Sequence, residues 1–282
     1  MPRSNKQKRR IWAVEEGVVR RKQDLLAGEE PLEILLRAGE EQRTLAITMR
    51  TPGNDYELAA GFLYNEGIIH DKHAIVQMTY CVDGGQQEYN SLRVQLATSA
   101  LPQLPQLERH FFTNSACGIC GTTMLEELAQ RKLPPLPEGP QLPPNFFTQL
   151  PDKLRQAQQL FESTGGLHAA ALFDAKGDLL ALREDVGRHN ALDKLIGWGV
   201  LNRQLPFHDK VIMVSGRASY ELLQKCAVAG SPIFCAISAP SSLALEVAEQ
   251  FGITLIGFLR GKTFNIYTGI ERIEIKSNGS FH

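Results

Sequence analysis

The chain has 282 residues, of which 43% are apolar and 22% are charged, which excludes global disorder and allows a sizeable core. Its net charge of −1 excludes a whole-molecule field that would draw it to nucleic acid or to an anionic membrane. Its apolar runs are too short and too interrupted by charge to span a bilayer. At roughly 100–200 residues per domain, the length indicates one large domain or two small ones.

The first thirty residues are locally basic, and we expect residues 1–30 to form a frayed basic tail. Arg9-Arg10 suggests a twin-arginine export signal, but no apolar segment follows, because residues 11–14 run directly into two glutamates. The five cysteines are an odd number in a chain without a signal peptide, which favours a reducing compartment. We therefore expect a cytoplasmic protein.

Residues 31–132 are predicted to form an N-terminal α+β portion that ends in a Cys-x-x-Cys arm. Asn54 and Glu57 fit a capping box, which predicts a helix start there, and Gly67 is the expected end of that helix. A further helix is predicted over residues 122–132. The predicted strands lie at residues 32–36, 44–49, 75–82 and 92–97.

A proline-rich segment follows, with seven prolines between residues 133 and 151. Proline lacks a backbone donor, so residues 133–150 are expected to form an exposed, extended loop and the main internal boundary. A helix is predicted to resume over residues 151–163 and to end at Gly165-Gly166.

Residues 151–282 alternate apolar strands with helices, which predicts an α/β domain whose mostly parallel sheet is covered on both faces. A hairpin is predicted around the turn at residues 174–178. The remaining elements are expected as helices at residues 190–197, 218–229 and 243–250, and as strands at residues 211–215, 233–237 and 254–258.

Three loops at the predicted carboxyl ends of strands are suited to an anion. Residues 215–219 join a strand to a helix, residues 239–242 do the same, and Leu259-Arg260-Gly261-Lys262 places two cations after the last strand. For each of the first two loops alone, an ordinary tight turn is favoured, with Ser215 or Ser219 as a helix cap in the first. A solvated loop explains the third equally well. Together they favour a nucleotide-sized ligand that carries phosphate.

Residues 183–190 form a polar run in which Asp185 and Asp193 lie four positions either side of His189. If the helix extends over this run, one carboxylate could orient the imidazole, although a structural ion-pair network is favoured. Metal ligation is disfavoured, because no second histidine lies at helical spacing. His168, which enters a strand, is interpreted as a core histidine.

Cys117 and Cys120 lie among glycines, and a Cys-x-x-Cys pair can be a redox couple, half of a zinc site or a nucleophile. Zinc is disfavoured, because the chain lacks a second such pair and the His-x-Glu of zinc deaminases. A thioredoxin-like domain is also disfavoured, because it places such a pair between a strand and a helix, whereas this pair follows the loop-like residues 101–106 and leads toward the proline-rich segment. The remaining interpretation is an accessible, nucleophilic thiolate near the start of the helix predicted from residue 122, where the helix dipole would lower the pKa of the thiol. Cys81, Cys226 and Cys235 are interpreted as buried small hydrophobes.

Several motifs together resemble the formate dehydrogenase accessory sulfurtransferase family, FdhD, from about Pro31 onward. The resemblance includes Thr51-Pro52-Gly53-Asn54-Asp55-Tyr56-Glu57-Leu58, Cys117-Gly118-Ile119-Cys120-Gly121, Thr164-Gly165-Gly166-Leu167-His168, Arg183-Glu184-Asp185-Val186-Gly187-Arg188-His189-Asn190-Ala191, Ser215-Gly216-Arg217-Ala218-Ser219-Tyr220-Glu221 and Gly257-Phe258-Leu259-Arg260. The first thirty residues and the proline-rich segment are not covered by it.

The resemblance implies a cytidine-deaminase-like, three-layer α/β fold without the zinc ligands, and no permanently bound metal. It implies a sulfur carrier that accepts sulfur from a cysteine desulfurase and delivers it to the bis-molybdopterin guanine dinucleotide cofactor of formate dehydrogenase. Cys117 matches the persulfide-bearing cysteine. The segment assigned to cofactor binding matches Phe258, Leu259, Arg260, Gly261, Lys262 and Thr263.

Further expectations follow from this resemblance. Cys120 is auxiliary, and it could resolve the persulfide, act as a second carrier or tune Cys117. GDP is expected to mimic the cofactor, and the partners are the desulfurase, the apo-form of formate dehydrogenase and, by analogy with the two-ended cofactor, a second copy. One alternative is a non-catalytic chaperone for the cofactor and apo-enzyme, and a weaker one is a thiol–disulfide oxidoreductase.

Overall fold

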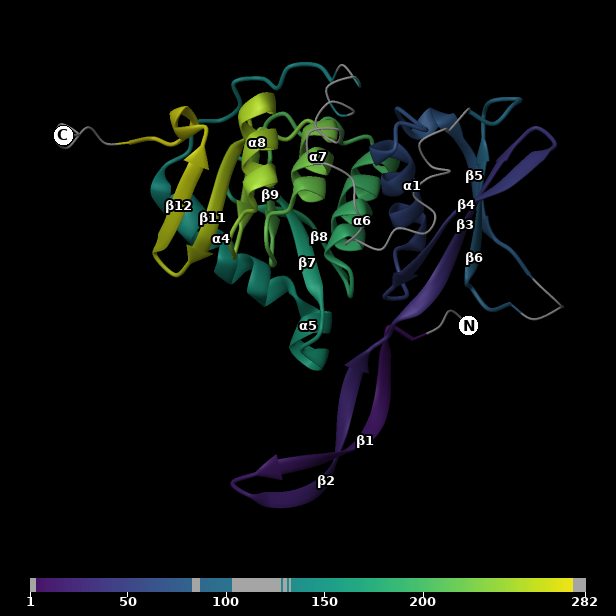
Figure 1. Ribbon diagram of the computed structural model, residues 1–282, viewed down its shortest axis with the longest axis horizontal. Coiled ribbons are helices and arrows are strands. Elements are labelled where there is room, and N and C mark those ends of the chain that lie inside the picture. Colours follow the sequence, from purple (N-terminus) through teal and green to yellow (C-terminus); the bar gives the residue numbers. More distant parts are fainter. Residues whose placement is uncertain (1–3, 83–86, 103–127, 129–130, 132, 276–282) are drawn as a thin grey trace. The chain divides into compact units, whose positions relative to one another are not determined.

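The computed structural model describes residues 4–82, 87–102, 128, 131 and 133–275 (Figure 1). These residues form two compact units that alternate along the chain. The first contains the described residues up to 102 together with Gln158–His168 and Glu184–Arg203. The second contains the described residues from 128 to 157, Ala169–Arg183 and those from 204 to 275. This division differs from the expected boundary in the proline-rich segment, because two later segments pack into the first unit.

The basic N-terminal segment forms an antiparallel hairpin of β1 (Lys6–Glu15) and β2 (Val18–Ala27), where a frayed tail was expected. Glu16 and Gly17 connect the strands, and both have positive φ, as a type I′ turn requires. Val14 and Val18–Val19 are apolar residues that flank this turn. The sequence does not predict this hairpin, because charged side chains interrupt the alternation of apolar and polar residues that marks a half-buried strand.

A four-stranded sheet in the order β4-β3-β6-β5 forms the main body of the first unit. Its strands are β3 (Glu30–Ala38), β4 (Glu41–Arg50), β5 (Ile75–Tyr80) and β6 (Ser91–Leu96), which confirms the four strands predicted for this part. Alternate residues on β3 and β6 are buried, as period-two patterning dictates. A short 3₁₀ helix, Lys72–Ala74, precedes β5.

Two helices of the first unit, α1 (Asp55–Asn65) and α6 (Arg188–Leu201), approach each other at a pair of glycines. A Cβ on Gly61 would lie 1.9 Å from Asp193 O, and one on Gly197 would lie 1.7 Å from Glu57 O. Only glycine therefore permits this crossing. The predicted capping box is wrong, since Asn54 adopts a left-handed conformation and its side chain makes no cap hydrogen bond.

A six-stranded mixed sheet, ordered β12-β11-β10-β9-β7-β8, is the centre of the second unit. Pairing is parallel among β9, β10 and β11, whereas β12 is antiparallel to β11 and β7 is antiparallel to β9. The α/β class with a mixed sheet is thus confirmed. The strands are β7 (His168–Phe173), β8 (Leu179–Asp185), β9 (Val211–Val214), β10 (Ile233–Ala236), β11 (Thr254–Arg260) and β12 (Thr263–Thr268).

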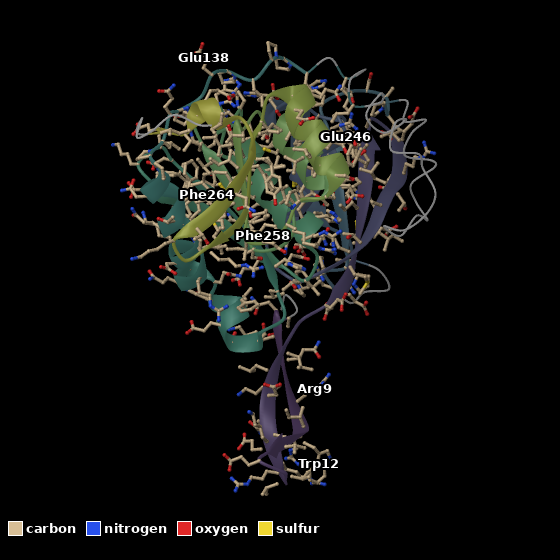
Figure 2. The ribbon with its side chains drawn as sticks, turned by 60° about the vertical axis from the view of Figure 1, so that its left-hand side comes forward. Arg9, Trp12, Glu138, Glu246, Phe258 and Phe264 are labelled. Carbon is tan, nitrogen blue, oxygen red and sulfur yellow. The ribbon has the colours of Figure 1, made fainter. Side chains whose placement is uncertain are left out.

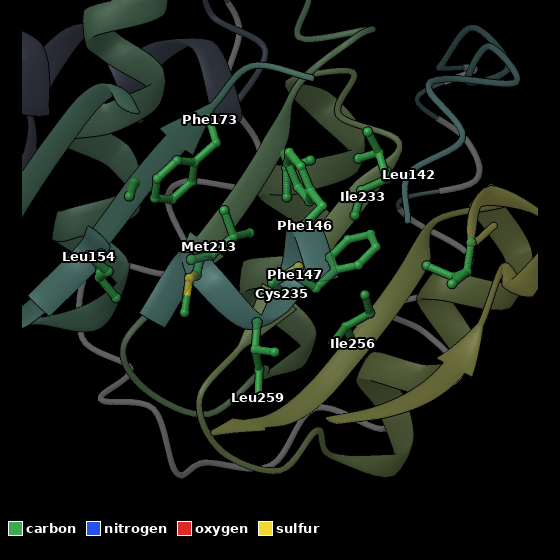
Figure 3. Close-up of a cluster of buried hydrophobic side chains, with 14 of the residues drawn as sticks. Leu142, Phe146, Phe147, Leu154, Phe173, Met213, Ile233, Cys235, Ile256 and Leu259 are labelled. Atoms are coloured by element: carbon green, nitrogen blue, oxygen red, sulfur yellow. The ribbon is translucent and has the colours of Figure 1, made fainter. Parts of the chain in front are cut away.

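Helix α4 (Pro144–Ala157) packs on one face of this sheet, where the sequence predicted an extended loop as far as residue 150. Pro144 is its first residue, a position that tolerates proline. Four apolar side chains at helical spacing outweigh Pro151, and they join the buried cluster of Figure 3: Phe146, Phe147, Leu150 and Leu154.

The opposite face of the sheet is covered by α7 (Tyr220–Val228) and α8 (Ser242–Phe251), so the second unit has three layers (Figure 1). Helix α8 contacts both β11 and β12. Strand residues on this face are buried as well, among them Leu172, Ile212 and Phe234.

In the first unit, α5 (Gln159–Thr164) ends at Gly165, with φ 72°, and packs against β2. A short 3₁₀ helix, Ile270–Arg272, follows β12.

Candidate functional site

The carboxyl ends of β9, β10 and β11 lie side by side in the second unit, because these three strands are parallel and in register. The loops that follow β9 and β10 therefore emerge at one edge of the sheet, as the sequence predicted. In open α/β sheets this edge is where ligands bind.

Backbone hydrogen bonds join the loops at this edge. Ala218 and Pro240 form an isolated parallel bridge, and the Ser238 N–H donates to Gly216 O at 3.3 Å. The Phe258 N–H in turn donates to Ser238 O at 3.2 Å. The two loops and the end of β11 thus hold one another in place.

Phe258 is the most unusual residue at this edge. Its φ is 51°, which is rare for an aromatic side chain, and it lies at a bulge in the β11–β12 pairing. Such a backbone costs on the order of 1–3 kcal/mol and is found mainly at functional sites. The side chain is 40% exposed, whereas Leu259 beside it is buried in the cluster of Figure 3.

Gly257 allows the bulge to form. A Cβ at this position would lie 2.9 Å from the Tyr267 ring and 3.2 Å from Ser238 O, so the neighbouring loop can approach only a glycine. Figure 2 labels Phe258 on β11 and Phe264 on the adjacent β12. Phe264 packs against the core, so Phe258 is the ring of these two that presents a face to solvent.

The predicted cationic segment lies in a hairpin turn and not in a loop beyond the last strand, because β11 continues to Arg260 and β12 returns from Thr263. Gly261 has φ 54°, as the first position of a type II′ turn requires. Arg260 Nε donates to Ile237 O at 3.1 Å, which holds an exposed guanidinium across the end of β10. Lys262 is exposed at the turn.

The start of α7 adds a polar group to this edge. Ser219 is the N-cap residue, yet its Oγ makes no cap hydrogen bond and is a buried atom with no partner among the described residues. A helix N-terminus carries partial positive charge. Arg217, two residues earlier, is exposed. By contrast, Ser241 caps α8 through a hydrogen bond from Ala244 N–H.

The polar run at residues 183–190 forms a separate network in the first unit. Asp185 and Lys194 are both buried, and Lys194 Nζ lies 2.6 Å from a carboxylate oxygen of Asp185. The same carboxylate accepts from the backbone N–H of Thr51 and of Gly187. Asp193 accepts from the Asn65 side chain at 2.6 Å. These partners support the favoured interpretation of a structural ion-pair network.

His168 lies near this network. Burial lowers the pKa of its imidazole, and the positive charges of Arg188 and His189 lower it further, against an opposing effect of Asp185. The side chain is half-buried, so the interpretation as a core histidine holds in part. Its neutral form is favoured in the folded chain.

Three of the five cysteines are described. Cys226 in α7 and Cys235 in β10 are fully buried, as predicted, and burial raises the pKa of both thiols. Cys81 is partly buried and follows β5. Cys117 and Cys120, the predicted carrier and its auxiliary, lie outside the described residues, as does most of the helix predicted over residues 122–132.

Within the described ranges, no three His, Cys, Asp or Glu side chains gather in a way that could hold a metal ion. The helices found there are also too short or too polar to cross a membrane.

Sequence reasoning missed three features of the site: the bulge at Phe258, the glycine that permits it and the buried Ser219 Oγ. The bulge at Phe258 and the glycine that permits it could have been suggested by one sequence signal, an aromatic residue directly after Gly257 near the end of a strand. No sequence signal distinguishes Ser219 from an ordinary capping serine.

Comparison with known proteins found a matching family model and several similar chains. The family model described as FdhD/NarQ matches residues 27–274. A sulfur carrier protein FdhD of Nocardia farcinica is 47% identical over 264 residues, which covers 92% of each chain. Its counterpart in Streptomyces coelicolor is 44% identical over 277 residues and covers 96% of each chain.

A more distant counterpart, sulfur carrier protein FdhD of Sulfolobus acidocaldarius, is 42% identical, over 94% of this chain and 98% of the relative. Among solved structures, a crystal structure assigned as a formate dehydrogenase accessory protein from Desulfotalea psychrophila superposes with a TM-score of 0.74. The match covers 96% of this chain and 100% of that one, at 25% identity.

Proposed function

The chain belongs to the FdhD/NarQ family, and we propose that it carries sulfur, as Cys117 persulfide, from a cysteine desulfurase to the molybdenum cofactor of formate dehydrogenase. The observation that carries this proposal is the near-full-length similarity to proteins named as sulfur carriers, at 42–47% identity. The resemblance assigns the carrier role to Cys117 and an auxiliary role to Cys120.

The described cysteines support this choice of nucleophile. A thiolate is needed to attack a persulfide, and burial raises the pKa of Cys226 and Cys235 well above the usual range. Neither is reachable by a partner's persulfide without unfolding of its element. Cys81 is the described cysteine that keeps some exposure, which makes it the natural control.

The accepting step is a thiol–persulfide exchange. The Cys117 thiolate attacks the terminal sulfur of the desulfurase persulfide, a new S–S bond forms at Cys117, and the desulfurase cysteine leaves as a thiolate. One sulfur–sulfur bond forms as another breaks, so no external oxidant or reductant is consumed. The sulfur transferred is the terminal atom alone.

We propose the β9–β11 edge as the binding site for the guanine nucleotide ends of the bis-molybdopterin guanine dinucleotide client. Phe258 offers an exposed ring for stacking on guanine, and its backbone strain is explained if the ligand requires that orientation. Arg217, Arg260 and Lys262 carry the positive charge that a diphosphate needs. The remaining predicted residues, Leu259, Gly261 and Thr263, support the bulge and the turn.

The carrier role is tested by mass spectrometry after incubation with a purified cysteine desulfurase and cysteine. We expect the peptide that contains Cys117 to gain the mass of one sulfur atom, and we expect Cys81→Ser to gain it equally. A Cys117→Ala variant that is still loaded on another residue would contradict the assignment, whereas Cys120→Ser should still accept sulfur at Cys117.

The nucleotide site is tested by calorimetric titration with GDP. Arg260→Ala and Phe258→Ala should each weaken binding by about tenfold or more, the loss expected for one charge-assisted contact or one stacked ring. Lys176→Ala is the matched control, since Lys176 is an exposed cation of the same unit in the turn between β7 and β8. Equal binding by all variants would place the nucleotide elsewhere.

A further inference from the structure

We propose that Arg188, His168 and His189 form a binding site for a small carboxylate anion at the start of α6. This inference goes beyond the proposed sulfur transfer and does not depend on it. All three residues lie in the first unit. They belong to two polar sequence motifs, at residues 164–168 and 183–191, that neither the sulfur carrier nor the nucleotide site uses.

Arg188, the first residue of α6, has a guanidinium group without a partner. Its Nε atom is buried and has no hydrogen-bond acceptor among the described residues. No carboxylate in the described part of the chain forms an ion pair with it either. Buried polar groups in folded proteins nearly always have a partner, and a buried cation without an anion is costly. The rest of the side chain is partly exposed, so an acceptor can reach it from solvent.

Two imidazoles add to the charge around Arg188. His189 follows it in α6, and His168 lies close enough for the positive charges of both residues to lower the pKa of its imidazole. An imidazole presents one N–H donor when neutral and two when protonated. The start of the helix adds a partial positive charge. Because these groups repel one another, an anion bound among them would be favoured.

The nearest carboxylate, Asp185, is fully engaged elsewhere. It opposes the effect of the cations on His168, and this effect is smaller than theirs. A carboxylate has about four acceptor positions, and those of Asp185 are taken by the Lys194 ammonium, the N–H groups of Thr51 and Gly187, and the Asn190 side chain. Asp185 therefore cannot turn to the guanidinium without breaking this buried network.

Glu184, the next carboxylate along the chain, is also engaged. One of its oxygens accepts from the Leu160 N–H at 3.0 Å and the other from the Phe161 N–H at 2.8 Å. These two N–H groups belong to the first turn of α5, whose N-cap residue makes no side-chain cap. Glu184 thus replaces that cap, which leaves the charge of Arg188 for an external anion.

Charge, shape and access together favour a small carboxylate. Arg188 is the permanent cation of the three, and the neutral form of His168 is favoured, so the cluster balances a monoanion better than a phosphate dianion. The Nε side of a guanidinium presents two parallel N–H groups, which match the two oxygens of a carboxylate. Each of the three side chains is only partly exposed, so the anion that reaches them must be small.

The test is a titration of the full chain with sodium formate, followed by NMR of isotope-labelled histidine side chains. The signal of His168 is identified by its loss in His168→Gln. With three non-hydrogen atoms, formate can bind with a dissociation constant no lower than about 0.5 mM, and we expect a value in the low millimolar range. Bound formate should also raise the pKa of His168, because an adjacent anion favours the protonated ring.

Variants of Arg188 test its role as the anchor. Arg188→Gln should raise the formate dissociation constant by about tenfold or more, since it removes a charge-assisted hydrogen bond. Arg188→Lys keeps the charge but loses the paired N–H groups, and it should weaken binding by about threefold or more. The matched control is Arg203→Gln, which removes an exposed arginine just beyond the other end of α6, about 20 Å away. It should bind formate within about twofold of the natural chain.

Thermal unfolding provides an independent readout and checks that each variant is folded. Formate should raise the melting temperature of the natural chain and of Arg203→Gln, but not that of Arg188→Gln. If Arg188→Gln does not fold, Arg188→Lys supplies the comparison. The proposal is overturned if formate up to about 50 mM leaves the His168 signal unmoved, or if Arg188→Gln binds as tightly as the natural chain. Equal effects of sodium chloride at the same concentrations, or phosphate binding tighter by about tenfold, would also overturn it.

Discussion

Lys194 Nζ lies 2.6 Å from a carboxylate oxygen of Asp185, and each side chain is at most 1% exposed. The pair joins three parts of the first unit, since Lys194 also donates to Thr51 O at 2.8 Å and Asp185 accepts from the Thr51 N–H. The motif that contains Asp185 and the one that contains Thr51 therefore meet in a single buried network. This network gives the polar residues Asp185 and Thr51 of the two motifs a role in folding.

Removal of the cation from this pair should destabilise the chain strongly. Lys194→Met leaves the Asp185 carboxylate buried without its partner, and we expect a loss of about 3–5 kcal/mol in the free energy of unfolding. Urea unfolding of the full chain measures it. Lys210→Met is the control, because Lys210 pairs with the exposed Asp209 at 2.7 Å, and it should cost about 1 kcal/mol or less.

The crossing of α1 and α6 should not tolerate a methyl group. Gly197→Ala would place a Cβ 1.7 Å from Glu57 O, so the helices must separate, at a cost of about 2 kcal/mol or more. Thermal unfolding gives the change. Gly166→Ala is the control: its φ is not positive and its nearest contact would be 3.9 Å. Similar melting temperatures for the two variants would show that the crossing adapts.

The stability of the first unit should fall in acid through His168. The folded pKa of His168 is lowered from 6.5, so as pH falls the unfolded chain binds a proton before the folded chain does. Stability contributed by the neutral imidazole is thus present above the unfolded pKa and lost below it. Between pH about 7.5 and about 5.5, the natural chain should lose more stability than His168→Gln in urea titrations. Parallel losses would remove His168 as the cause.

Cys226 and Cys235 should resist alkylation in the native chain, because burial disfavours their thiolates. Iodoacetamide followed by peptide mapping measures this, with labelling in urea as the reference for full reactivity. Partly exposed Cys81 should react faster than either. Native labelling of Cys235 at the rate of Cys81 would mean that β10 opens readily.

Periodicity predicted most of the fold, because the core strands and helices bury regular apolar faces. Each strand predicted among the described residues is present, although β11 is two residues longer than expected. Predictions that depended on a single residue type were weaker. Pro151 lies inside α4, since four buried side chains outweigh it, and Asn54 starts α1 without the predicted side-chain cap.

The sequence predicted the location of the candidate site at the sheet edge, but not its local backbone structure. The parallel order of β9, β10 and β11 follows from alternating strands and helices, so their loops were correctly expected at one edge. Strand β12 was missed, because Thr263–Thr268 alternates polar and apolar residues over only six positions. Because β12 was not predicted, the hairpin turn at Gly261 was not predicted either, and neither was the bulge at Phe258 that depends on the β11–β12 pairing. The β1–β2 hairpin was missed because charged side chains interrupt the alternation of apolar and polar residues that marks a half-buried strand.

The most direct test of sulfur transfer through Cys117 is formate dehydrogenase activity in a strain that lacks this protein. Each variant is expressed in that strain, and its level is checked by immunoblot. The natural chain and Cys81→Ser should restore activity, and Cys117→Ala should leave it at the level of the empty strain. Full activity with Cys117→Ala would contradict the account and would favour a chaperone that holds the cofactor and the apo-enzyme without carrying sulfur.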